Sequence, residues 1–238
     1  MFNNQKYKSF ALQQLKGRWG IPIIISAIIT VVTSIFAMPD FIRSFEQLQN
    51  LEALATTTVT TSSNTSIISS LIQTIVSGIF TIAALNVYIQ MTRSPEPVSF
   101  SLFIEGLNNW WRATLATLWR FIWVLLWSLL FFIPGIVKSI SYSMMPYIIA
   151  EYKNVSVAKA MKISMVITKG HKMDLFGLGL SFLGWILLSV FTLGIGLIVL
   201  SPYMELTYVN TFHDLLQEAI QNGSIKLDWS SYPSENHF

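Results

Sequence analysis

The feature that most constrains this chain is a series of apolar runs long enough to cross a lipid bilayer. Residues 20–38 carry no charge, and a hydrocarbon core about 30 Å thick needs roughly 20 such residues in a helix. Residues 53–92 are also free of charge, but 56–66 consist almost entirely of Ser and Thr, which is typical of an exterior loop. The second crossing is therefore predicted over 67–91. Only 11% of the chain is charged, against about a quarter in soluble domains, so a soluble enzyme is excluded.

Two further apolar blocks, 113–150 and 175–212, are each too long for a single crossing. Each has helix-breaking residues near its middle, and these predict two tight hairpins with turns at Pro134 and Gly135 and at Gly194 and Gly196. The predicted crossings are 113–133, 136–152, 174–193 and 195–215. The fold class is thus an all-α integral membrane protein with six transmembrane helices, formed by one domain over 1–216 and a short cytoplasmic tail over 217–238.

The distribution of Lys and Arg predicts the orientation of these crossings. Basic residues concentrate in the N-terminal arm and in the segment between the two hairpins, where Lys169 and Lys172 lie, whereas the opposite loops carry few. The positive-inside rule then places both termini in the cytoplasm of a multi-pass cell-membrane protein. A cleaved signal peptide is the alternative for residues 20–38, but this run is longer than a usual signal-peptide core.

Short segments before the crossings resemble one another. Residues 8–19, 99–111 and 156–168 each read as an amphipathic helix, and Lys159 and Lys162 flank the apolar stripe of the third. Such helices suit the inner-leaflet interface, where Lys can reach lipid head groups. The pattern predicts three modules, each an interfacial elbow helix followed by a hairpin. Coincidence among apolar segments is the alternative.

The chain offers no recognisable catalytic or metal-binding set. It has no cysteine, and its three histidines lack metal-ligand spacing, so no metal and no cofactor is expected. Gly177, Ser181 and Gly184 superficially resemble a nucleotide loop, but they lie inside an apolar span and instead predict close helix packing. Nucleic acid is excluded as a partner, because the basic residues border the spans without forming an aromatic–basic surface.

One polar group near the middle of the bilayer stands out. Glu205 lies within the sixth predicted span, and ionisable side chains at such depth usually face protein or water. Several polar or kink-forming residues are predicted at similar depth: Arg120, Asn86, Tyr147, Glu151, Tyr208, Pro146 and Pro202. One hypothesis is a polar cavity in which Glu205 and Arg120 serve as gate, proton site or ligand contacts. The other is a buried Glu–Arg pair, with further polar contacts between helices, that only stabilises the bundle.

The last part of the chain resembles a known family. The words that carry the resemblance lie between residues 142 and 215: Tyr-Ser-Met-Met-Pro-Tyr, Ala-Met-Lys-Ile-Ser-Met, Lys-Gly-His-Lys-Met-Asp-Leu-Phe, Leu-Ser-Phe-Leu-Gly-Trp-Ile-Leu-Leu, Thr-Leu-Gly-Ile-Gly and Ser-Pro-Tyr-Met-Glu-Leu-Thr. They resemble the bacterial integral membrane proteins catalogued as domain of unknown function 975. That family is distantly similar to the membrane portion of some glycerophosphodiester phosphodiesterases, whose catalysis lies in a separate soluble domain. The resemblance implies a bacterial membrane fold and no catalytic residue.

These observations favour a non-catalytic bacterial inner-membrane protein that binds membrane lipid, an amphipathic peptide or another membrane protein, in envelope maintenance or protection. The alternative is a small permease or channel component that uses the Glu205 and Arg120 region. A membrane enzyme acting on lipid head groups is disfavoured, because general acid–base catalysis needs positioned partners that the chain does not offer.

Overall fold

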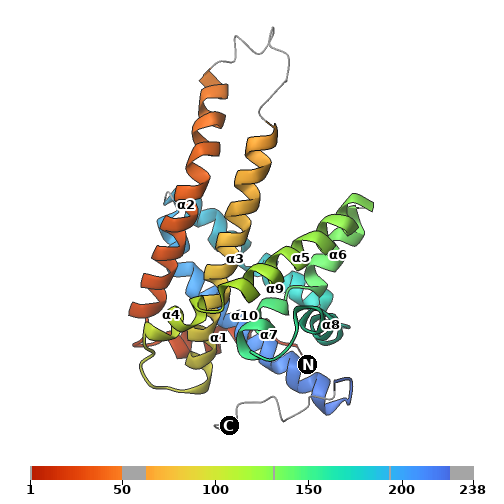
Figure 1. The fold of residues 1–238 in the computed structure, drawn as a ribbon. Helices are drawn as coiled ribbons and strands as arrows, with labels where there is room; N and C mark the ends of the chain where they lie inside the picture. The colour runs from red at the N-terminus through yellow and green to blue at the C-terminus, as the bar shows by residue number, and fades with distance from the viewer. Residues whose placement is uncertain (1, 50–62, 131, 193, 226–238) are drawn as a thin grey trace.

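The computed structural model of the chain describes residues 2–49, 63–130, 132–192 and 194–225. These residues form helices and connecting turns, without strands (Figure 1). The helices are α1 (Asn4–Leu15), α2 (Gly20–Gln49), α3 (Ser63–Arg93), α4 (Ser101–Leu107), α5 (Trp110–Leu130), α6 (Phe132–Ser141), α7 (Met145–Glu151), α8 (Val157–Ile167), α9 (Lys172–Phe191) and α10 (Ile195–Gln221).

Four of the described helices are long and apolar enough to cross a membrane. The crossing segments are Gly20–Pro39 in α2, Ser69–Arg93 in α3, Trp110–Leu130 in α5 and Lys172–Ser189 in α9. They coincide with four of the six predicted spans. Helix α10 is as long as these helices, but Glu205 and its polar neighbours lower its mean hydropathy. The Ser/Thr-rich stretch over 56–62 and the tail beyond residue 225 lie outside the described residues.

The predicted span over 136–152 is wrong as a single helix. Helix α6 ends at Ser141, a turn follows, and α7 begins at Met145 with a proline in its first turn. Pro146 has no N–H to donate to the carbonyl of Tyr142, and in a continuous helix its ring would clash with that carbonyl, so α6 ends before it and α7 starts anew. The carbonyl of Ser141 accepts bonds from Ser164 Oγ (2.8 Å) and Thr168 Oγ1 (3.4 Å) of the α8 segment, which replace the lost helix bonds.

The first predicted turn and the start of the tail differ from their predicted positions, whereas Gly194 of the second turn lies where it was predicted. Pro134 and Gly135 lie inside α6, because α5 ends at Leu130 and α6 already begins at Phe132. Gly135 instead allows close packing, since a Cβ there would lie 2.9 Å from Ser128 Cα of α5. Gly194 has a φ of 84° between α9 and α10, and Gly196 lies in the first turn of α10. Helix α10 continues to residue 221, so the predicted tail begins too early.

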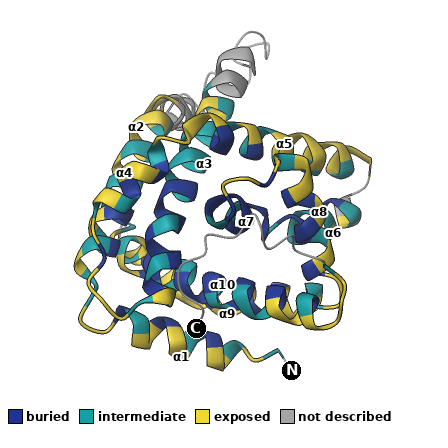
Figure 2. Cartoon of the chain, turned by 60° about the horizontal axis from the view of Figure 1, so that its bottom comes forward, coloured by how far each residue is buried: buried dark blue, intermediate teal, exposed yellow. Residues whose placement is uncertain are grey.

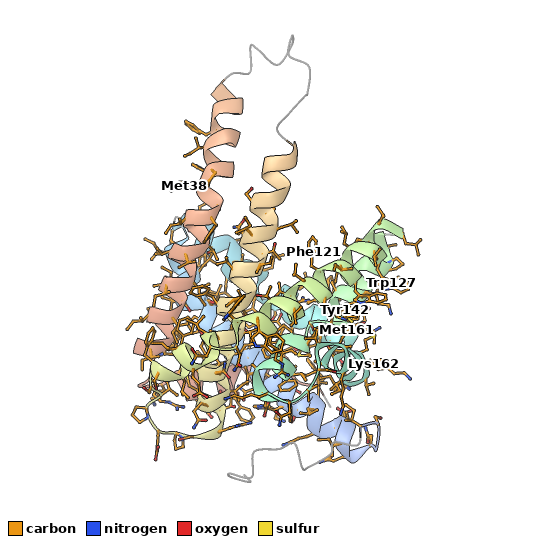
Figure 3. All side chains as sticks on the ribbon, viewed as in Figure 1. Met38, Phe121, Trp127, Tyr142, Met161 and Lys162 are labelled. Carbon is orange, nitrogen blue, oxygen red and sulfur yellow. The ribbon has the colours of Figure 1, made fainter. Side chains whose placement is uncertain are left out.

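Three short helices, α1, α4 and α8, lie at one end of the molecule, which we call the elbow end (lower part of Figure 1). Each packs against a helix that returns to this end: α1 against α10, α4 against α3, and α8 against α7. The hairpin of α2 and α3 extends furthest from the elbow end, and Met38 lies on its outer part (Figure 3). Figure 2 shows that the buried residues concentrate on the inward faces of the helices.

Polar side chains fix the elbow helices onto the returning helices. Gln14 of α1 and Asn210 of α10 exchange two hydrogen bonds of 3.0 and 2.8 Å. Tyr7 donates to Asp214 Oδ2 at 2.5 Å and Lys6 pairs with Asp214 Oδ1 at 3.2 Å. Burial, followed by the hydrogen bond to Asp214, raises the pKa of the Tyr7 phenol well above its ordinary value, so it stays a donor.

Two arginines donate hydrogen bonds to backbone carbonyls at the ends of returning helices. Arg18 donates to the carbonyls of Ser94 (2.7 Å) and Glu96 (3.0 Å) just beyond α3. Arg112 donates to the carbonyl oxygens of Tyr152 (2.7 Å), Lys153 and Val155 beyond α7. The last carbonyls of a helix have no partner within that helix, and a guanidinium with five N–H groups can satisfy several of them at once.

Replacing Arg112 with Gln should therefore lower the free energy of unfolding by about 2–4 kcal/mol, because three carbonyls lose a charged donor in a buried place. The change would be measured by denaturant unfolding in detergent micelles. The matched control is Lys153→Gln, which breaks only the exposed pair with Glu105 (2.7 Å) and should cost less than about 1 kcal/mol. Equal losses in the two variants would contradict this role for Arg112.

Candidate functional site

Helices α3, α7 and α10 meet at the centre of the bundle, and α7 brings Tyr147 against α10. The Tyr147 ring stacks on Phe212 with ring centroids 5.9 Å apart. Its hydroxyl donates to Glu205 Oε2 at 3.1 Å. The break before Pro146 makes this contact possible, because it ends α6 and redirects the chain into α7. Tyr147 and Glu205, which the sequence placed at similar depth, are therefore direct partners.

Glu205 lies in the wall of a cavity of about 460 Å³. Residues from α3, α5, α9 and α10 and from the α6–α7 segment line this space. Its polar lining residues are Thr81, Arg120, Ser139, Ser143, Tyr147, Glu205 and Tyr208. The predicted grouping of Glu205 with Arg120, Tyr147 and Tyr208 is thus present around one cavity, which we call the Glu205 cavity.

A second cavity, of about 580 Å³, lies between α2, α3, α5 and α7. It shares Thr81, Arg120 and Pro146 with the Glu205 cavity. The remaining polar side chains that line it are uncharged: Thr33, Gln73, Thr74, Ser77 and Thr117. Arg120 thus lies between two spaces, and we call this second space the hydroxyl cavity.

Arg120 and Glu205 do not form an ion pair. Among the described residues, the salt bridges within 4.0 Å connect other partners, and Glu205 is bonded to Tyr147. No hydrogen-bond acceptor contacts the Arg120 guanidinium in the described part of the chain. Two opposite charges therefore line one cavity without neutralising each other. The direct Glu–Arg pair of the structural hypothesis is absent, whereas the Tyr147–Glu205 hydrogen bond is a polar contact between helices of the kind that the same hypothesis predicts.

Two of the predicted polar residues lie elsewhere. Asn86 donates to the carbonyls of Ile82 (3.2 Å) and Ala83 (3.3 Å) in its own helix. It sits where α3 and α4 approach closely, since a Cβ on Gly106 would lie 2.6 Å from Asn86 Nδ2. Glu151 belongs to a separate cluster at the elbow end, which is described below.

The residues predicted for helix packing behave differently from one another. No atom of the described chain lies within 4 Å of a Cβ placed on Gly177 or Gly184, and Ser181 is exposed. The side of α9 that packs internally instead carries Leu178 and Phe182. Pro202 is buried inside α10, whereas Pro146 lines both cavities. The predicted stripe on α9 therefore does not pack within this chain.

The predicted interfacial lysines lie at the elbow end. Lys159, Lys162 and Lys169 are exposed, and Lys172 is half-buried. Lys162 extends from the outer side of α8 (Figure 3). The inner side of α8 carries the buried residues Ala160, Met161, Ile163, Ser164 and Ile167. The lysines therefore stand outside the packed face of the helix, where the amphipathic pattern predicts them.

Sequence reasoning missed one cluster of ionisable side chains. Glu151 of α7 pairs with Arg93 of α3 at 2.6 Å and with His213 of α10 at 3.0 Å. The three returning helices thus meet in one polar contact, and the Glu151 side chain is only 4% exposed. Arg93 ends the long uncharged run before it, which was the available signal in the sequence. The sequence did not predict that Glu151 would be the partner of Arg93, because the break between α6 and α7 determines where Glu151 lies.

Comparison with known proteins finds one family whose model matches part of the chain. Residues 131–219 match the family described as "Protein of unknown function (DUF975)". This match covers the segment from α6 to α10 and supports the identification of the chain as a member of the DUF975 family. No curated protein and no solved structure matches the chain. The distant similarity to the membrane portion of glycerophosphodiester phosphodiesterases stays a prediction.

Replacing Glu151 with Gln should lower the free energy of unfolding by about 2–4 kcal/mol, because the loss of the buried carboxylate leaves Arg93 and His213 without a charged partner. The partial exposure of Arg93 favours the lower half of this range. Glu105→Gln, which removes an exposed carboxylate, is the control and should cost less than about 1 kcal/mol. Denaturant unfolding in the same detergent would measure both free energies of unfolding. An unchanged value for Glu151→Gln would contradict the role of Glu151 in joining the three helices.

Proposed function

We propose that this chain is a non-catalytic multi-pass protein of the bacterial cell membrane that binds a lipid or an amphipathic peptide at Arg120. The observation that carries the proposal is the position of Arg120, a cation without a described acceptor, between the Glu205 cavity and the hydroxyl cavity. A guanidinium inside a membrane is costly unless an acceptor or water meets it. A bound molecule that supplies an acceptor would remove that cost.

The same proposal includes six crossings arranged as three modules. Helices α2, α5 and α9 would lead away from the elbow end, and α3, the broken pair α6 and α7, and α10 would return. Three similar contacts support this arrangement. Arg18 reaches carbonyls beyond α3, Arg112 reaches carbonyls beyond α7, and His171 Nε2 lies 3.3 Å from Glu218 Oε1 of α10. In each case a residue before or at the start of an outgoing helix holds the returning helix of the same module.

Envelope maintenance or protection against a membrane-active peptide would suit a protein of this kind, and both remain part of the proposal. A small permease or channel component is the second candidate. It is favoured by one observation, namely that cavities lie on two sides of Arg120 and share part of its surroundings. A transported solute would have to pass between them, whereas a bound lipid or peptide would stay in one or both.

The orientation is testable because the chain has no cysteine, so an introduced cysteine is the only thiol. Ile133→Cys and Ile195→Cys, at the far ends of two hairpins, should react with a membrane-impermeant maleimide on intact cells. Lys16→Cys and Lys169→Cys, at the elbow end, should react only after permeabilisation, since that end would face the cytoplasm. Labelling of Lys169→Cys in intact cells would overturn the proposed orientation.

Mass spectrometry of molecules that co-purify in native-lipid discs tests the binding site. The unaltered protein should retain a specific lipid or peptide, and Arg120→Gln should lose most of it, about tenfold or more, because the guanidinium is gone. Lys162→Gln is the control, since it removes an exposed charge from the same protein and should keep the ligand. The same co-purified molecules at the same amounts in Arg120→Gln would contradict the proposed site.

A further inference from the structure

The lining of the Glu205 cavity contains two charged residues, and their charges are opposite. Arg120 contributes a positive charge and Glu205 a carboxyl group, and the other described residues that line the cavity are polar without charge or apolar. When Glu205 is ionised, the wall is neutral as a whole but carries separated charges. Both side chains are only partly exposed, so each charge favours a partner of its own.

The positive side of this wall offers unused donors. The Arg120 guanidinium has no acceptor in the described part of the chain, and it suits phosphate and carboxylate groups, which can accept two of its N–H groups together. Ser143 Oγ is buried without a hydrogen-bond partner in the same described residues, and Ser143 also lines the cavity. A buried hydroxyl without a hydrogen-bond partner is costly, and it could donate a hydrogen bond to an anionic oxygen of a bound molecule.

The negative side has unused acceptor capacity. Glu205 receives one hydrogen bond, from Tyr147 Oη to its Oε2, whereas a carboxylate with two oxygens can accept about four. An ammonium group has three donors and could bond to the remaining positions without displacing Tyr147.

We infer that the Glu205 cavity binds a zwitterion, a molecule whose ammonium group meets Glu205 and whose phosphate or carboxylate group meets Arg120. A simple anion would neutralise Arg120 and leave Glu205 charged, and a simple cation would do the opposite. A zwitterion brings no net charge into the membrane, and the desolvation of each of its two ionic groups is offset by a contact with an opposite charge in the cavity wall. This inference rests on the proposed function and names the ligand class of its site.

The apolar lining of the cavity favours a zwitterion that carries a hydrocarbon chain. Leu85, Ile140 and Leu175 line the cavity beside the charges, and two further lining residues, Phe176 and Leu180, are 42% and 51% exposed on α9. The cavity wall therefore continues onto the outer surface of α9, where a chain could extend. A phosphoethanolamine head group fits this description, either on a lipid or as the free molecule.

The test is native mass spectrometry of the protein, delipidated in a non-ionic detergent, with added phosphatidylethanolamine or phosphatidylglycerol. The unaltered protein should bind phosphatidylethanolamine about tenfold more tightly than phosphatidylglycerol. Arg120→Gln should lose both lipids. Glu205→Gln should reverse the preference towards phosphatidylglycerol, because only the cation remains, and Lys162→Gln should bind as the unaltered protein does. Free phosphoethanolamine that competes equally well would show that the source is soluble and would support the same chemistry.

Tighter binding of phosphatidylglycerol by the unaltered protein would overturn the zwitterion inference and leave the proposed binding function standing. Binding of neither lipid nor free phosphoethanolamine would overturn the inference and the lipid part of the proposed function, and the absence of any co-purified molecule that depends on Arg120 would overturn the peptide part as well. If the two Gln variants do not fold, the unaltered protein still decides the matter. Phosphoethanolamine should then displace phosphatidylethanolamine, whereas phosphate alone and ethanolamine alone should not, and displacement by phosphate alone would contradict the inference.

Discussion

The arrangement of this bundle depends on how the carbonyl groups at the ends of its returning helices find donors. The last carbonyls of a helix have no partner within that helix, so side chains from other parts of the protein donate to them. Arg112 does this for the carbonyls beyond α7, Arg18 for those beyond α3, and Ser164 with Thr168 for the carbonyl at the end of α6. These contacts make the interruption between α6 and α7 tolerable. That interruption in turn brings Tyr147 to Glu205 and opens the α6–α7 segment towards the cavity.

The charges in the interior fall into two groups with different surroundings. At the elbow end, each carboxylate oxygen of Glu151 has a partner, Arg93 or His213, and the three residues together join α3, α7 and α10. Deeper in the bundle, Arg120 and Glu205 line one cavity without touching. The first group pairs internally, as charges that serve packing do. The second leaves its charges available, which is the arrangement expected of a binding site.

Much of the fold followed from the length and composition of the apolar runs. Crossing helices over Gly20–Pro39, Ser69–Arg93, Trp110–Leu130 and Lys172–Ser189 were predictable because burying backbone in lipid requires long uncharged helices. The break over residues 142–144 was not, because a proline within an apolar run is compatible with either a kink or a full interruption. Only the contacts of Ser141 with Ser164 and Thr168 decide between them.

The candidate site was predictable in part for a similar reason. Depth along the helices placed Glu205, Arg120, Tyr147 and Tyr208 at one level, and they do line one cavity. Depth does not specify the direction of a side chain around the helix axis. Asn86 instead donates to the carbonyl of Ile82 in its own helix, and Glu151 pairs with Arg93. The Gly177, Ser181 and Gly184 stripe does not pack in the bundle, because Leu178 and Phe182 bury more apolar area on a neighbouring face, about 100° further round α9.

The claim that Arg120 and Glu205 stay unpaired and form a binding site is tested most directly by an experimental structure in native-lipid discs, at a resolution that shows side chains and bound molecules. It should show Arg120 and Glu205 apart, with density for a bound molecule that contacts both. A direct ion pair between Arg120 and Glu205, with the cavity closed around it, would contradict the account and make these residues structural.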